Sequence, residues 1–219
     1  MWTKELFGTE KPIIALLHLD PLPGDPDFCG SLDTVIEHAS CDVKALQEGG
    51  VDGVLIANEF SFPMTYVSHT ETLMAMACVI GAIKKDIHVP FGTNVVMNPE
   101  ETIRMAKAVG ASFGRSAFAG AFTGTYGVHV NNFGENVRLK YALGIPEMKL
   151  LCKINPEGDV LLAEQSIEEI IDNVTLGDHV GAFCVSGPGA GQEASWDLLA
   201  HVCDLAKAKH VPVFCNTGC

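Results

Sequence analysis

Seven strand-length apolar runs constrain the fold of this chain most strongly, because each is followed by sequence with helical periodicity. The unit repeats about every 30 residues, as a βα unit does. Near-continuous apolar strands are typical of parallel sheets that are covered on both faces. The expected strands are Pro12–Leu19, Asp52–Glu59, Phe91–Val96, Ser112–Ala117, Met148–Asn155, Ala182–Gly187 and Pro212–Thr217.

Helix boundaries support this repeat. Asn98-Pro99-Glu100-Glu101 predicts a helix cap with proline at the first helical position, and Ser166 with Glu169 predicts a capping box. Glycines at the expected helix ends, at Gly49-Gly50, Gly110, Gly144 and Gly177, provide left-handed caps.

A parallel αβ repeat of this kind forms either a barrel or an open doubly wound sheet. An open dinucleotide-binding sheet usually carries GxGxxG after its first strand, whereas this strand ends in His18-Leu19-Asp20-Pro21-Leu22-Pro23-Gly24. We therefore expect an α/β fold of the TIM-type (βα)8 barrel class in one domain, 1–219, truncated after the seventh strand. An unclosed barrel leaves two sheet edges, so we expect this chain to be oligomeric or aggregation-prone unless a further C-terminal βα unit completes it.

Charge and composition exclude several functions. The net charge of −13 argues against nucleic acids and anionic membrane surfaces as partners. No apolar run is long enough to cross a bilayer, and the first ten residues do not resemble a signal peptide. We expect a cytoplasmic protein that binds a small anionic or sugar-like ligand and forms a homo-oligomer, with no inserted membrane segment.

The eight cysteines form no CxxC pair and no Cys/His cluster. Cys152, Cys184 and Cys215 lie inside apolar runs, where a reduced thiol behaves as a small hydrophobic group. Cys215 and Cys219 form at most a weak half-site for a metal. We therefore expect no metal and no cofactor.

Polar residues occur near the C-terminal end of every expected strand, where the active site of a TIM-type barrel lies. Side-chain alternation places each on the face of a core residue two positions earlier. A charge within a parallel strand is costly unless it is paired or used, which singles out Arg115 and Lys153, with Glu59 as their expected counter-ion. The candidate catalytic residues are Glu59, Lys153, Arg115 and His18, and the candidate substrate-binding residues are Asn94, Ser186, Gly187, Gly189, Asn216 and Gly218.

Structural alternatives apply to each candidate. A Glu–Lys or Glu–Arg pair can serve stability alone, and His18 can be a hydrogen-bonded core histidine. The segment from Ser186 to Gly191, backed by Asn216–Gly218, suggests anion binding through backbone amides, although a flexible βα loop has the same composition.

The segment His18–Gly24 resembles the BtpA/SgcQ family. Gly49–Gly53 with Asn58–Ser61, Pro90–Val95, Cys184–Gly187 and Asn216–Gly218 are similar to its SgcQ-like branch. The resemblance implies a ribulose-phosphate-binding-type barrel. It also implies either carbohydrate metabolism or, in the other branch, the biogenesis of membrane complexes such as photosystem I.

Two functions follow. The first is an enzyme that isomerises, epimerises or cleaves a small sugar or sugar phosphate, with Glu59 as general base and Lys153 or Arg115 stabilising an oxyanion. Lys153 as a Schiff-base former is a variant of this function. The second is a non-catalytic assembly factor built on the same scaffold.

Overall fold

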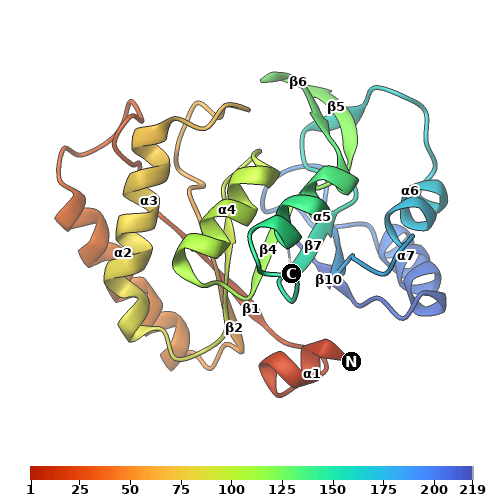
Figure 1. Ribbon diagram of the computed structural model, residues 1–219, viewed down its shortest axis with the longest axis horizontal. Helices are drawn as coiled ribbons and strands as arrows, with labels where there is room; N and C mark the ends of the chain where they lie inside the picture. Colours follow the sequence, from red (N-terminus) through yellow and green to blue (C-terminus); the bar gives the residue numbers. More distant parts are fainter. Residues whose placement is uncertain (219) are drawn as a thin grey trace. The chain divides into compact units, whose positions relative to one another are not determined.

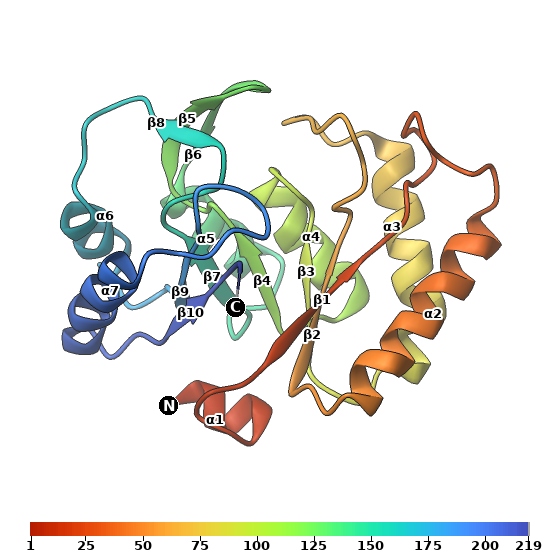
Figure 2. The same cartoon turned by 180° about the vertical axis from the view of Figure 1, so that it is seen from behind.

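The computed structural model describes residues 1–218; Cys219, and with it the weak half-site, lies outside the described residues. The chain divides into two compact units, Met1–Gly114 and Arg115–Cys219. Each unit alternates strands with helices (Figures 1 and 2).

The first unit has parallel strands in the order β1-β2-β3-β4. Each strand shares a continuous parallel register with its neighbour: Leu16 pairs with Leu55, and Thr93 pairs with Gly114. Helices α2 and α3 lie side by side along this sheet (Figure 1). The elements are α1 (Trp2–Phe7), β1 (Ile14–His18), α2 (Leu32–Glu48), β2 (Gly53–Ala57), α3 (Thr70–Ile83), the 3-10 turn η1 (Lys84–Asp86), β3 (Phe91–Asn94), α4 (Pro99–Val109) and β4 (Phe113–Ser116), which ends in the second unit.

The second unit has parallel strands in the order β7-β9-β10 and a separate three-stranded antiparallel sheet in the order β6-β5-β8. Helices α6 and α7 lie side by side (Figure 2). The elements are β5 (Gly120–Gly124), β6 (Gly127–Asn131), α5 (Phe133–Ala142), β7 (Lys149–Lys153), β8 (Asp159–Leu161), α6 (Ile167–Val174), β9 (Ala182–Val185), α7 (Trp196–Ala208) and β10 (Val213–Cys215).

The core of the first unit forms where the apolar faces of α2 and α3 meet the strands. Leu17, Val54 and Ile56 from the sheet pack with Val43 and Ile80 from the helices, and all are at most 1% exposed. Burying side chains of this size stabilises the fold by about 1.5–3 kcal/mol each.

All seven predicted parallel strands are present. The capping box of Ser166 and Glu169 is also confirmed, as are the left-handed glycines at Gly50, Gly110, Gly144 and Gly177. The expected Asn98 cap is wrong: its side-chain amide donates instead to the carbonyls of Val96 and Thr65, so α4 begins on Pro99 without a side-chain cap.

Candidate functional site

Five side chains of the second unit, four at strand ends and one in the turn after β7, join in one polar network. The Nη1 of Arg115 donates to the Oδ1 of Asn216 at 2.9 Å. The Nδ2 of Asn216 donates to the Oγ of Ser186 and to the Oε1 of Glu157, both at 2.9 Å. The Oε2 of Glu157 forms an ion pair with the Nζ of Lys153. Asn216 is therefore the centre of a chain of contacts that runs from one cation to the other.

Parallel pairing brings Lys153, Ser186 and Asn216 close together at the C-terminal ends of their strands. Lys153 is the last residue of β7, and it pairs with Cys184 of β9, which in turn pairs with Phe214 of β10. Two residues further along, Ser186 and Asn216 follow β9 and β10. The backbone amide of Asn216 donates to the Val185 carbonyl at 2.8 Å. Such C-terminal strand ends carry the active site in barrels of this type.

Glu157 is the main functional candidate that the sequence did not reveal. It lies in the turn after β7, four residues beyond Lys153. Burial raises the pKa of its carboxyl, but the Lys153 ammonium and hydrogen bonds, one of them from Ser186, outweigh burial and hold this pKa below its usual value. Glu157 is thus a carboxylate at neutral pH, and it is the ion-pair partner of Lys153 that we expected Glu59 to be.

The network is largely shielded from water. Arg115 and Ser186 are 6% and 2% exposed, whereas the side chains of Lys153 and Glu157 are 20% and 14% exposed. Charges and polar groups in such a setting act more strongly than in water. The partial exposure of the ion pair leaves it open to a ligand.

Three further candidates, His18, Glu59 and Asn94, lie in the first unit. His18 ends β1, and its ring packs edge-on against Phe60 with 5.7 Å between centroids. Asn94 ends β3 and is 5% exposed. Glu59 lies half-buried in the turn after β2. His18 and Asn94 thus stand at the ends of β1 and β3, and Glu59 follows β2, the strand that lies between those two.

The glycine-rich loop after β9 is folded against the segment after β10. The Gly187 amide donates to the Oγ1 of Thr217 at 3.1 Å, and that hydroxyl donates to the Gln192 carbonyl at 2.8 Å. A Cβ on Gly187 would lie 2.0 Å from the Gln192 carbonyl oxygen, and one on Gly218 would lie 2.4 Å from the Glu193 nitrogen. Close backbone packing therefore explains both glycines, and one of the amides expected to bind an anion is already used.

Gly189 differs from these two glycines. A Cβ on Gly189 would meet only atoms of the Gln192 side chain, at 3.3 Å or more. The N-terminus of α7 is capped by the Ser195 hydroxyl, which accepts from the Leu198 amide at 3.1 Å. The backbone amides that follow Gly187 in this loop are therefore the ones available to bind a ligand.

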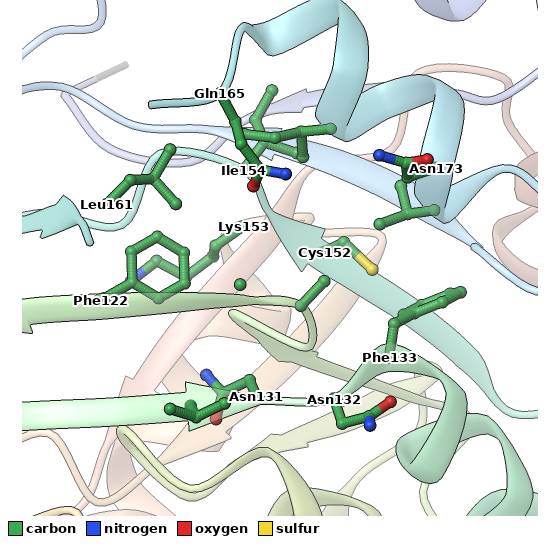
Figure 3. A pocket seen from close by; sticks show the side chains of 15 residues that line it. Phe122, Asn131, Asn132, Phe133, Cys152, Lys153, Ile154, Leu161, Gln165 and Asn173 are labelled. Atoms are coloured by element: carbon green, nitrogen blue, oxygen red, sulfur yellow. The ribbon is translucent and has the colours of Figure 1, made fainter. Parts of the chain in front are cut away.

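Two cavities flank β7 and β8 within the second unit. The first, of about 370 Å³, is lined mainly by apolar side chains, with the carboxamides of Gln165 and Asn173 at its rim (Figure 3). Lys153 is also one of its lining residues. The second, of about 590 Å³, is lined by Asn155, Ser186, Gly187 and Asp159 among others. Both fall in the size range of small-molecule sites.

Within residues 1–218, no group of three or more His, Cys, Asp or Glu side chains is arranged to hold a metal ion. No helix in this part of the chain combines the length and apolarity needed to cross a membrane.

Comparison with known sequences decides the family. The sequence model of the BtpA family matches residues 9–219. The chain belongs to the BtpA family. A relative from Escherichia coli (strain K12), named putative sgc region protein SgcQ, is 42% identical over 99% of this chain and 81% of its own. The photosystem I biogenesis protein BtpA of Synechocystis is 27% identical over 98% of this chain and 75% of its own.

Solved structures agree with the barrel fold. A dihydropteroate synthase from Xanthomonas albilineans matches with a TM-score of 0.60 and 16% identity, covering 93% of this chain and 70% of that one. A putative dihydrodipicolinate synthetase from Pseudomonas aeruginosa matches with a TM-score of 0.57 and 18% identity, covering 94% and 64%. At this level of identity the match shows a shared TIM-type α/β fold and nothing about the reaction.

Proposed function

We propose that this BtpA-family protein is a cytoplasmic enzyme that acts on a small sugar or sugar phosphate by acid–base chemistry. The observation that carries the proposal is the network that joins Arg115, Asn216 and Lys153 at strand ends through Glu157 in the turn after β7. Two cations and a carboxylate gathered in a shielded setting are more than a strand end needs for solvation. They suit a reaction in which negative charge develops on a substrate oxygen.

Each residue has a role in this proposal. Lys153 and Arg115 stabilise an enediolate or similar oxyanion, since both carry positive charge at 20% exposure or less. Glu59 is the proposed general base, and Glu157 orients Lys153. Lys153 as a Schiff-base former is the alternative chemistry, and it requires the ammonium to leave Glu157 and lose a proton.

His18, whose imidazole lies at the end of β1, is the remaining proposed catalytic residue. The other candidates are proposed to bind substrate, and Asn94 offers a side-chain amide at the end of β3. Ser186 and Gly187 line the larger cavity, Gly189 follows them in the same loop, and Asn216 contacts Ser186 from the segment after β10. A phosphate or carboxylate there would take amides of the glycine-rich loop that no protein acceptor occupies.

Turnover of a panel of sugar phosphates, aldoses and ketoses tests this function. Once a substrate is found, Lys153→Met and Glu59→Gln should each reduce kcat by about a hundredfold or more. The matched control is Lys44→Met, because Lys44 pairs with Glu48 at the same four-residue spacing on the surface. Full activity in Lys153→Met and Glu59→Gln would assign both residues to structural roles.

A second function rests on the name of one relative. The Synechocystis protein is described as a photosystem I biogenesis protein, so a non-catalytic assembly role is the alternative for this chain. If the chain is an assembly factor, Lys153→Met should still bind its partner and keep its function. If the chain is an enzyme, the same substitution should abolish its function. Complementation of a strain lacking the gene by this variant distinguishes the two.

A further inference from the structure

The three-stranded sheet of the second unit has one apolar face that meets solvent. Strand alternation puts Phe122, His129 and Leu161 on the inner face, where Phe122 stacks on the His129 ring at 5.2 Å. The residues between them point the other way: Val128, Val130 and Val160 are 60%, 73% and 64% exposed. Three exposed valines on one small sheet are an interaction surface rather than scattered apolar residues.

The β5–β6 hairpin of this sheet is also free of formal charge. From Ser116 to Gly134 the sequence has no Asp, Glu, Lys or Arg, in a chain whose net charge is −13. Two copies of so acidic a protein repel each other over most of their surfaces. The uncharged hairpin is where a second copy can approach at the least electrostatic cost.

Strand β6 lies at one edge of the sheet, and β5 is its one strand neighbour in the described part of the chain. The β5–β6 hairpin projects from the rest of its unit (Figure 1). Natural edge strands are usually protected by a lysine, a proline, an inward charge or a bulge. Gly127–Asn131 contains no lysine, proline or acid, and it pairs with β5 in unbroken register. Such an edge is suited to pairing with another strand.

The sequence of β6 is self-complementary. Val128-His129-Val130 reads the same in both directions about His129. Antiparallel pairing of two β6 strands about a two-fold axis at His129 places Val128 of each copy opposite Val130 of the other. Both valines then cover one another on the outer face, while the histidines stay on the inner face. A two-fold interface needs this kind of symmetry.

We propose that β6 pairs with β6 of a second copy, joining two three-stranded sheets into one six-stranded sheet across a symmetric homodimer. The partner of the β6 edge is therefore the same chain, Val128 and Val130 are the apolar side chains that meet across it, and the site residues of the proposed enzyme take no part. This interface is independent of the proposed function and can fail or succeed without it.

Sedimentation velocity over a wide range of concentrations, with wild type and two variants, tests the proposal. Val128→Lys should raise the dimer dissociation constant by about tenfold or more, because it removes a central apolar contact and brings two like charges together across the axis. Leu176→Lys is the matched control: Leu176 is 72% exposed in the same unit but lies outside the sheet, and its dimer should be unchanged.

Hydrogen exchange on the wild type provides a second measurement that needs no variant. Amides of residues 127–131 should become more protected as the protein concentration rises through the dissociation constant. A wild type that stays monomeric, a dimer that Val128→Lys leaves intact, or exchange at 127–131 that does not change with concentration would each overturn the proposal.

Discussion

Glu157 holds its carboxylate against the Lys153 ammonium across four residues, from the turn after β7 to the last residue of that strand. The same carboxylate accepts from Asn216, which ties the ion pair to the ends of β9 and β10. This relationship gives the second unit a defined charge arrangement, and it leads to a prediction about pH.

The stability of the folded chain should fall in acid partly through Glu157. Its pKa is lower in the fold than in the unfolded chain, so its carboxylate stabilises the fold above the unfolded value of about 4.3, and this contribution is lost as the pH falls through the folded pKa. Glu157→Gln should destabilise the protein by about 1–3 kcal/mol at neutral pH and flatten its acid dependence. Urea unfolding between pH 3 and about 7 measures both effects.

Glu48→Gln is the control for this prediction, because Glu48 also pairs with a lysine four residues away, but at 3.9 Å and on the surface. An exposed pair of this kind contributes about 0–1 kcal/mol. Equal effects of the two variants at neutral pH would mean that the Lys153–Glu157 pair is an ordinary surface pair.

Asn216 should matter more to activity than its effect on stability suggests. Asn216→Ala removes the contacts to Arg115, Glu157 and Ser186, so both cations lose their common support. We expect kcat to fall roughly tenfold or more with a smaller change in KM, and stability to fall by about 1–3 kcal/mol.

Asn136→Ala provides the comparison. Asn136 is a buried asparagine of the same unit, 2% exposed, but it lines neither cavity and its side-chain amide donates to the Phe118 carbonyl at 2.9 Å. A similar loss of stability with kcat largely retained is expected. If Asn136→Ala lowers kcat as much as Asn216→Ala does, the network has no special catalytic role.

The repeat of apolar strands and periodic helices was sufficient to predict the seven parallel strands. A strand that is buried on both faces has a near-continuous apolar sequence, which is easily recognised. Arg115, Lys153, Ser186 and Asn216 were predicted as site residues for the same reason: each stands at a visible strand end. The contact between Ser186 and Asn216 follows from the register of the neighbouring strands β9 and β10.

Two features could not be predicted from the sequence. Glu157 lies in Pro156-Glu157-Gly158, which has the composition of any turn, and only folding brings it back over Lys153. The sheet of β5, β6 and β8 is built from short strands within connecting segments, two of which, β5 and β6, begin at glycines. One of its two pairings joins β5 to β8, which lies more than 30 residues further along the chain. Periodicity over a few residues cannot predict such a distant partner.

The loop after β9 should tolerate a side chain at one glycine and not at another. Gly187→Ala forces a Cβ to within 2.0 Å of the Gln192 carbonyl oxygen, a backbone atom that cannot move alone. We expect a loss of about 1–3 kcal/mol in thermal unfolding. Gly189→Ala meets only the flexible Gln192 side chain at 3.3 Å, so it should change stability little. A stable Gly187→Ala would show that Gly187 is not packed against the Gln192 backbone in solution.

Thiol labelling should separate the cysteines by their place in the fold. Cys152 and Cys184 are each 2% exposed, and burial raises the pKa of both thiols, that of Cys184 to about 12. Since the thiolate is the reactive form, neither should react with a disulfide reagent in the folded protein at neutral pH. Cys29, Cys41 and Cys78 are exposed and should react first.

Cys203 provides an internal comparison of reaction rates among the exposed thiols. It is exposed, yet partial burial and the neighbouring Asp204 raise its pKa, so it should react more slowly than the exposed thiols of the first unit. Peptide mapping after a time course measures each site separately. In urea all of them should react at similar rates, because the fold no longer shields any thiol. Cys152 or Cys184 reacting as fast as Cys41 without denaturant would mean that β7 and β9 open readily, and the strand-end network between them could not then be a preformed site.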